Sequence, residues 1–207
     1  METRAQEIAK PMDKSELIRR IEASDKVHAE TMEENPTEIV SEQLSFYKKF
    51  KLIRVIVRLP QRPLQFRYAD DGKQAFVLGA TPEHIYKLNL EDGLRLRVEQ
   101  VPAYARFFFE NTNAGSLKIV ESDQDFRWRQ TVGGDATAKD LQQRARQIVH
   151  PVRVEPLPES GGFRAVANAV RRTTLMEMSL RVSLDGHVQV ESERTLAVNL
   201  PVVEVAW

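Results

Sequence analysis

Basic residues gather in YKKFKLIRVIVRLPQRPLQFRY, residues 47–68, which holds seven Lys or Arg and no Asp or Glu. A nucleic-acid-binding surface collects positive charge on one face, beside aromatic rings that stack on bases. The candidate basic face consists of Lys48, Lys51, Arg54, Arg58, Arg62 and Arg67. The alternation of Arg54 and Arg58 with apolar neighbours is equally typical of a half-buried strand, with Phe66 and Tyr68 turned into the core. We favour the strand, and nucleic-acid binding remains an alternative.

The first 43 residues carry the opposite charge. They hold eleven acidic and six basic side chains, a net charge of −5 (6 − 11), whereas the whole chain balances 30 Lys and Arg against 30 Asp and Glu. This acidic segment can lie across the basic strand face of the same chain or reach the basic face of a second subunit. The alternative is that both segments are simply solvated, since exposed ion pairs contribute only ~0–1 kcal/mol each.

Motifs for catalysis are absent from the sequence. There is no cysteine, which excludes a thiol nucleophile and a thiolate metal site. No G-x-S-x-G motif occurs, and no glycine run has the spacing of a Walker or Rossmann turn. The four histidines lack partners at metal-motif spacing: His28, His84, His150 and His187. We therefore predict no catalytic residue, no metal and no cofactor, and favour a protein that is not an enzyme.

Other side chains form candidate binding sites. A small-ligand pocket between a curved sheet and its helices would use Tyr104, Arg106, Arg127 and Arg171. Three consecutive phenylalanines exceed what a one-sided helix can bury, so we name an interface set of Phe107, Phe109 and Trp207, with a second layer of the same fold as the alternative. Asp123 and Asp125, two residues apart, suit a cation site or an acid/base pair, or pair with neighbouring arginines on a solvent face.

Two helices are predicted near the N-terminus. Asp13 with Glu16 indicates a capped helix that runs to about Met32, with a narrow apolar face. Asn35 before Pro36 is a stronger start signal, and the apolar spacing that follows predicts an amphipathic helix over residues 36–49.

Strands and turns dominate the remainder. From Lys51 the chain is rich in β-branched residues, and Asp71-Gly72 predicts a hairpin. A helix is expected from Thr81-Pro82 to Gly93, and another around YARFFFEN. Residues 152–200 suggest an antiparallel meander of three or four strands. The proline-rich run at 150–162 is a hinge or, as we favour, an edge strand with a loop.

The last hairpin permits a prediction of register. A two-residue turn at Asp185-Gly186 would pair Val182 with Gln189 and place an apolar side chain opposite a polar one. A three-residue loop with Gly186 in the left-handed conformation instead pairs Val182 with Val188. Because a one-residue slip moves every side chain to the other face, we predict the three-residue loop with a glycine bulge.

The predicted fold class is α+β, with a mainly antiparallel sheet, including the C-terminal three- or four-strand meander, covered on one face by helices. We expect an acidic N-terminal helical arm at residues 1–34 and a single domain at 35–207. With no signal peptide or membrane span in the sequence, we expect a cytoplasmic protein. The favoured function is a non-catalytic protein-interaction or self-association domain, with a protein partner or a homo-oligomer. A ligand-pocket protein and nucleic-acid binding are the alternatives.

Overall fold

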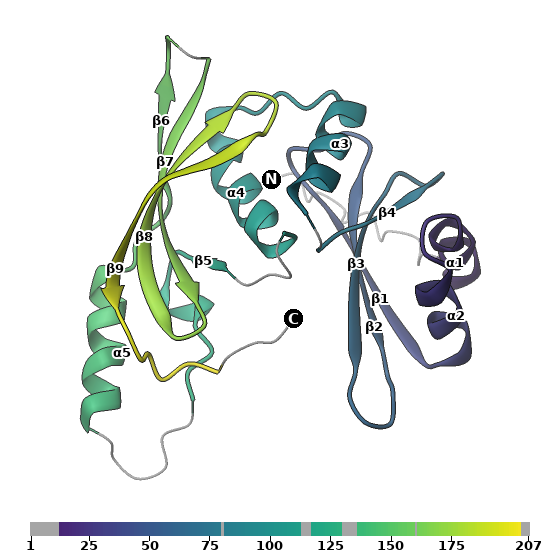
Figure 1. The fold of residues 1–207 in the computed structure, drawn as a ribbon, viewed down its shortest axis with the longest axis horizontal. Coiled ribbons are helices and arrows are strands. Elements are labelled where there is room, and N and C mark those ends of the chain that lie inside the picture. Colours follow the sequence, from purple (N-terminus) through teal and green to yellow (C-terminus); the bar gives the residue numbers. More distant parts are fainter. Residues whose placement is uncertain (1–12, 80, 113–116, 130–135, 160, 204–207) are drawn as a thin grey trace, which may run out of the picture. The chain divides into compact units, whose positions relative to one another are not determined.

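The computed structural model describes residues 13–79, 81–112, 117–129, 136–159 and 161–203 of the chain (Figure 1). Within these residues the fold is α+β, with five α-helices and antiparallel sheets, which confirms the predicted class. There are two sheets, and the chain forms two compact units. Unit 1 comprises the described residues up to Gln43 together with Lys51–Val77, and unit 2 comprises Leu44–Phe50 together with the described residues from Leu78 onward. None of the described helices is long and apolar enough to cross a membrane.

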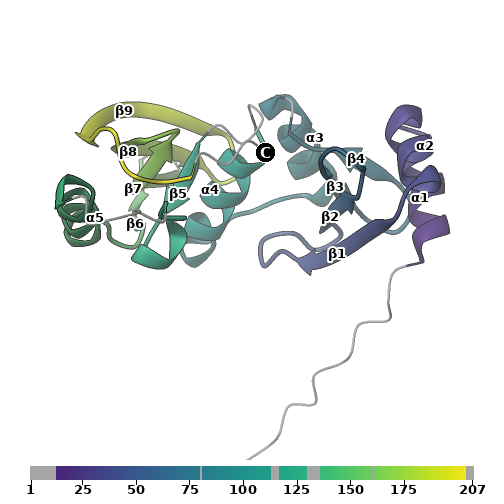
Figure 2. The ribbon, with the colours of Figure 1, turned by 90° about the horizontal axis from the view of Figure 1, so that it is seen from below.

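Unit 1 is a four-stranded antiparallel sheet with two helices packed on it. Figure 2 shows the two helices side by side. The strand order is β1-β2-β3-β4. The elements are α1 (Lys14–Glu22), α2 (Lys26–Glu34), β1 (Thr37–Gln43), β2 (Lys51–Val57), β3 (Leu64–Asp70) and β4 (Ala75–Val77).

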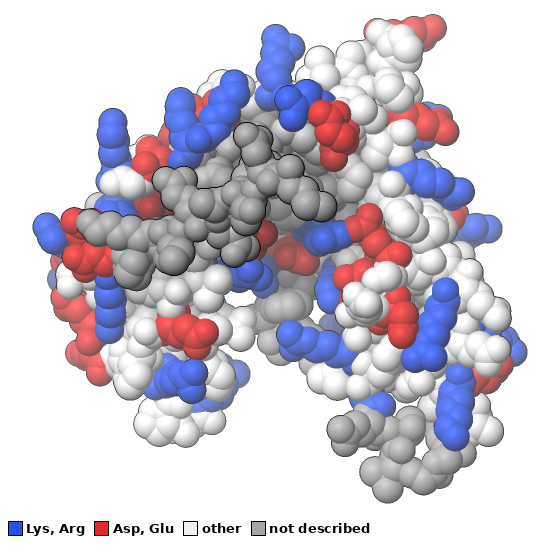
Figure 3. All heavy atoms as spheres, turned by 180° about the vertical axis from the view of Figure 1, so that it is seen from behind, with Lys and Arg blue, Asp and Glu red and all other residues white. Residues whose placement is uncertain are grey.

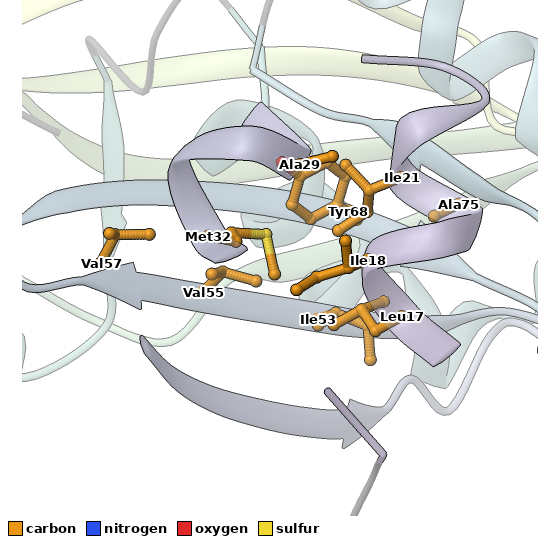
Figure 4. Close-up of a cluster of buried hydrophobic side chains, with 10 residues drawn as sticks. All are labelled: Leu17, Ile18, Ile21, Ala29, Met32, Ile53, Val55, Val57, Tyr68 and Ala75. Atoms are coloured by element: carbon orange, nitrogen blue, oxygen red, sulfur yellow. The ribbon is translucent and has the colours of Figure 1, made fainter. Parts of the chain in front are cut away.

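The acidic N-terminal segment contributes the helices of this core. Figure 4 shows apolar side chains of α1 and α2 directed onto the sheet. The buried cluster combines residues of the two helices with residues of β2, β3 and β4: Leu17, Ile18, Ile21, Ala29, Met32, Ile53, Val55, Val57, Tyr68 and Ala75. Burial of an aliphatic side chain contributes about 1.5–3 kcal/mol, so this face stabilises the helices against the sheet. The boundary expected after residue 34 falls inside unit 1, between α2 and β1.

The single helix predicted from Asp13 to Met32 is two helices. Asp13 caps α1, as predicted, by accepting a hydrogen bond from Ser15 N at 2.9 Å. The chain turns after Glu22, and Asp25 caps α2 by accepting from His28 N at 3.1 Å. The break allows both short helices to lay apolar residues on one sheet.

The helix predicted at residues 36–49 is wrong. Residues Thr37–Gln43 form β1, which pairs antiparallel with β2 so that Ile39 lies opposite Val55. Asn35 does not start a helix but ends α2, where its side-chain amide donates to Thr31 O at 2.9 Å. The start signals were local, and the ladder to β2 outweighs them because it pairs the backbone of the whole strand and packs Ile39 against the same core.

Unit 2 combines a five-stranded antiparallel sheet with three helices. The strand order is β5-β7-β8-β9, and β6 also pairs with β7. The helices are α3 (Pro82–Asp92), α4 (Val101–Glu110) and α5 (Ala136–Ile148), and two 3-10 turns are η1 (Val98–Gln100) and η3 (Asp123–Asp125). The strands are β5 (Lys118–Val120), β6 (Arg153–Leu157), β7 (Gly162–Arg171), β8 (Thr174–Ser183) and β9 (Val188–Ala197).

Several predictions for unit 2 are confirmed. The helix that begins after Thr81 ends at Gly93, whose φ of +66° is left-handed. The proline-rich run forms the edge strand β6 rather than a hinge. Figure 1 shows β7, β8 and β9 as a curved meander. Leu175 and Val170 pack with Ala145 of α5 in one apolar cluster of this sheet.

The predicted register of the last hairpin is also confirmed. Val182 lies opposite Val188, and Leu180 lies opposite Val190. Gly186 has a φ of +85° and donates to Ser183 O, while Ser183 N donates to His187 O at 2.9 Å. The loop therefore has three residues, as the alternation of apolar side chains requires.

Candidate functional site

The basic face is partly neutralised within unit 1. Arg54 lies 2.7 Å from Glu42, and Arg58 lies 3.2 Å from Glu38, so the acids of β1 cover arginines of β2 and the loop that follows it. This is the arrangement expected if acidic and basic segments of one chain pair. Each pair is exposed and contributes little to stability. The acids nevertheless reduce the positive charge available to a polyanion.

The other members of the basic face occupy different settings. Arg67 lies opposite Arg54 on β3, Lys51 begins β2, and Arg62 is exposed in the loop between β2 and β3. Lys48 belongs to unit 2, where its backbone N–H donates to Asp92. Figure 3 shows Lys and Arg interspersed with Asp and Glu over the face drawn there.

The four residues proposed to line a ligand pocket are engaged separately. Tyr104 is fully buried in unit 2, and Arg106 forms an ion pair with Glu121. Arg171 lies 2.8 Å from Glu193 across the sheet. The backbone carbonyl of Arg127 accepts from Val203 N at 2.7 Å. The side chains of Tyr104, Arg106 and Arg171 therefore have three different partners.

The phenylalanines of the interface set lie inside unit 2. Phe107 is 4% exposed and packs against Phe46 and Tyr47, and Phe109 is 9% exposed and packs edge-on against Phe108. Their surroundings match the alternative in which the rings fill a second layer of the same fold. Trp207 lies outside the described residues.

The paired carboxylates serve the local backbone and side chains. Asp123 accepts from Trp128 Nε1 at 2.9 Å and from Arg146 Nε at 2.8 Å, and these donors lower its pKa. Asp125 accepts from Glu121 N and from Ser122 N. The Asp125 carboxylate therefore stabilises the η3 turn, and the Asp123 carboxylate links that turn to Trp128 and to Arg146 of α5. Among the described residues, no group of three or more His, Asp or Glu side chains could hold a metal ion.

The histidines lie in unlike environments. His187 stacks on Tyr86 at 4.2 Å and lies 3.4 Å from Asp185. His150 is half-buried in the segment between α5 and β6, and His84 is in the first turn of α3. His28 is half-buried in unit 1, between Asp25, Phe66 and Tyr68. Sequence spacing did not reveal the His28 cluster, because its members come from α2 and β3.

A buried hydrogen-bond network fixes the turn between β8 and β9. Tyr47 Oη donates to Asn89 Oδ1 at 2.7 Å, and Asn89 Nδ2 donates to Tyr104 Oη at 2.7 Å and to Asp185 O at 3.0 Å. Tyr104 Oη donates to Gly186 O at 2.6 Å. Burial raises the pKa of both tyrosines, so both hydroxyls remain donors. We call Tyr47, Asn89, Tyr104 and Gly186 the turn network.

Glycine is required at position 186 for two reasons. Its φ is left-handed, and a Cβ there would lie 2.5 Å from Asn89 Nδ2 and 2.6 Å from Tyr104 Oη. The sequence analysis found Gly186 but missed Asn89. The available signal was the spacing of Ile85, Leu88, Asn89 and Asp92, which places two polar residues on the buried face of α3.

The same turn determines which backbone groups of β9 point outward. Ser183 N donates to His187 O, so the hydrogen-bonding groups of His187 face β8. These groups alternate in direction along an antiparallel strand. The backbone groups of Val188 and Val190 therefore point away from β8. Tyr86 Oη lies 3.4 Å from Val188 N and 3.5 Å from Val188 O. The tyrosine side chain therefore covers the edge of the strand at Val188. No described strand pairs with β9 on this side.

Charged side chains of β9 are held by the sheet to which the strand belongs. The pairs are Arg164–Glu191 (3.4 Å), Arg171–Glu193 (2.8 Å) and Arg194–Glu177 (2.9 Å). A shift of register lies between Ser179 and Leu180, opposite Glu191. Val190 is 40% exposed. The open edge of β9, from Val190 onward, thus combines a fixed turn, outward backbone groups and ordered charges, and it is the candidate functional site.

Comparison of the chain with protein-family models, curated proteins and solved structures finds no significant match.

Proposed function

We propose that this chain is a non-catalytic protein-binding module that adds an extended segment of a different protein to the open edge of β9. The observation that carries the proposal is the outward-pointing backbone at Val190, in a ten-residue strand that no described strand pairs on that side. Strand addition gives affinity through main-chain hydrogen bonds and specificity through the alternating side chains.

The turn network supports this function by holding one end of β9 in place. The backbone carbonyls of Asp185 and Gly186 accept hydrogen bonds from buried side chains of α3 and α4. A strand that is already ordered loses less conformational entropy when a partner binds. The fixed turn therefore favours binding without contacting the partner.

A second copy of the chain is a poor occupant of this edge. In an unbroken antiparallel register, two β9 strands related by a two-fold axis at residue 192 would place Glu191 opposite Glu193. An axis at residue 193 would place Glu193 opposite Glu193 of the second copy. Axes at residues 191 and 194 would likewise place Glu191 opposite Glu191 and Arg194 opposite Arg194. Like charges directly opposite are destabilising. Charge therefore disfavours pairing centred on residues 191–194, and pairing centred on Val190 would need the edge at Val188, where Tyr86 Oη lies. We therefore favour a different protein as the occupant.

The two faces of the sheet specify the partner's chemistry. Val190 lies opposite Leu180 and Glu193 lies opposite Met178, so both share one face of the sheet, whereas Arg194 shares the other face with Glu177. A complementary segment carries an apolar residue beside Val190 and a basic residue beside Glu193. On its other face it carries an acidic residue beside Arg194.

The experiment is a selection of displayed peptides of about twelve residues against the full chain, a length that spans an edge strand. The dissociation constant of a selected peptide is then measured for wild type, Val190→Pro and Val190→Thr. Proline removes the outward N–H and blocks the edge without removing a bond to β8, since Pro is tolerated at edges. Threonine keeps the N–H and the β-branched shape and is the matched control.

We expect Val190→Pro to weaken binding at least about tenfold, as loss of about 1.4 kcal/mol would do, and Val190→Thr to change it little. Glu193→Lys should disfavour the peptides selected by wild type and favour peptides with an acid at the matching position. Equal binding of these peptides to wild type and Val190→Pro would overturn the proposal.

A further inference from the structure

His28 is the half-buried histidine that joins α2 to β3 in unit 1. Its ring stacks on Phe66 with centroids 3.8 Å apart. Its Nδ1 atom lies 3.0 Å from Tyr68 Oη and 2.9 Å from Asp25 Oδ2. One ring nitrogen therefore faces both a hydroxyl and a carboxylate.

These two neighbours favour opposite protonation states of that nitrogen. When Nδ1 carries no proton, it accepts a hydrogen bond from the Tyr68 hydroxyl. When the ring is protonated, Nδ1 becomes a donor, and the carboxylate of Asp25 is its acceptor. The Tyr68 hydroxyl then has no acceptor at His28. Tyr68 is fully buried, and a buried donor without a partner is unfavourable.

Few charged groups lie around the ring in the part of the chain that the structure describes. Asp25 is the N-cap of α2 and acts electrostatically on both His28 and Tyr68. From α1, Arg20 is bound bidentately to Asp70 of β3, with distances of 2.7 Å and 3.2 Å. Lys26 of α2 is exposed and lies 3.7 Å from Glu30. Phe66 and Tyr68 of β3 carry no charge at neutral pH.

We propose that the His28–Tyr68 contact is a pH-sensitive attachment of α2 to the sheet, which neutral His28 maintains and protonation of His28 weakens. The attachment of α1 through Arg20 and Asp70 carries no histidine and remains. Acidification therefore loosens one helix of unit 1 selectively.

Burial lowers the pKa of His28, and the carboxylate of Asp25 opposes this shift without cancelling it. The unfolded chain therefore binds a proton at higher pH than the folded chain does. The contribution of His28 to stability is present above its ordinary pKa of about 6.5 and is lost as the pH falls through the lowered value.

The test is an NMR titration of His28 in the full chain, together with amide exchange of α2 expressed as protection factors. We expect the His28 pKa to lie below its ordinary value, Tyr68→Phe to raise it and Asp25→Asn to lower it. Between about pH 8 and about pH 5, the protection factors of Lys26–Glu34 should fall by up to tenfold for each unit by which the pKa of His28 is lowered. The protection factors of α5 should not change in this way.

Two variants separate this contact from a general effect of acid. His28→Gln cannot be protonated and should make α2 protection independent of pH over this range. His150→Gln is the matched control and should behave as wild type. A wild-type α2 whose protection does not change with pH, or a His28 titration unaffected by Tyr68→Phe, would overturn the proposal.

Discussion

The substitution Gly186→Ala tests the turn network most sharply. The new Cβ would lie 2.5 Å from Asn89 Nδ2, 2.6 Å from Tyr104 Oη and 2.8 Å from Leu94 Cδ2. These contacts are shorter than real Cβ atoms show, so the turn or the network must move. The residue would also keep a left-handed φ of +85°.

The expected loss of stability is the sum of two effects. A left-handed conformation costs a non-glycine residue about 1–2 kcal/mol. Displacement of Asn89 and Tyr104 leaves buried polar groups without partners, at about 1–3 kcal/mol each. We therefore expect Gly186→Ala to lose about 3–8 kcal/mol, a large part of the stability of about 5–15 kcal/mol that is usual for a domain.

Gly93→Ala is the matched control in the same unit. Gly93 also has a left-handed φ, +66°, but a Cβ there meets nothing within 4 Å. It should lose only the conformational part, about 1–2 kcal/mol. Urea unfolding followed by tryptophan fluorescence reports on unit 2 through Trp128, which packs against its apolar cluster. Equal losses in the two variants would refute the close approach of Gly186 to Asn89 and Tyr104.

Three further predictions concern the described contacts. Asp92→Asn should destabilise unit 2 by about 1.5–3 kcal/mol in the same assay, because Asp92 is 4% exposed and accepts from Lys48 N and Lys49 N. A double-mutant cycle of Arg54→Gln and Glu42→Gln should give a coupling below about 1 kcal/mol, since the pair is about half exposed; a larger coupling would contradict a surface role. Light scattering after size exclusion should give the mass of a monomer, 23.7 kDa, because the charges of β9 oppose self-pairing; a dimer that Val190→Pro dissociates would contradict that interpretation.

The sequence was most informative where alternation along a strand determined on which face of the sheet each side chain lies. The loop at Asp185 and Gly186 followed from apolar alternation on both strands, because a two-residue turn would have placed Val182 opposite a polar residue. The α3 helix followed from a proline at its start and a glycine at its end. These signals are local and strong, and tertiary contacts agree with them.

Residues 36–49 show why other features could not be predicted. Asn35, Pro36 and helical spacing indicated a helix, but the segment divides between β1 and the stretch Leu44–Phe50 of unit 2. Its conformation depends on β2 and Asp92, which lie later in the chain. The ion pairs of Glu38 and Glu42 with arginines depend on the pairing of β1 with β2. They could not be predicted while this segment was expected to be a helix.

The candidate site was equally dependent on tertiary structure. Gly186 was visible in the sequence, but its close approach to Asn89 and Tyr104 requires α3 and α4 to meet the turn. The outward direction of Val190 follows from the hydrogen bond between Ser183 and His187. Burial of Phe107 and Phe109 required the layer formed with Phe46 and Tyr47.

The most direct test of strand addition at β9 is amide hydrogen exchange of the full chain with and without a selected peptide. The outward N–H of Val190 should exchange readily in the free protein and become protected by at least about tenfold in the complex, because it gains a main-chain acceptor. Protection that appears elsewhere in the chain, with Val190 unchanged in the complex, would contradict the proposed function.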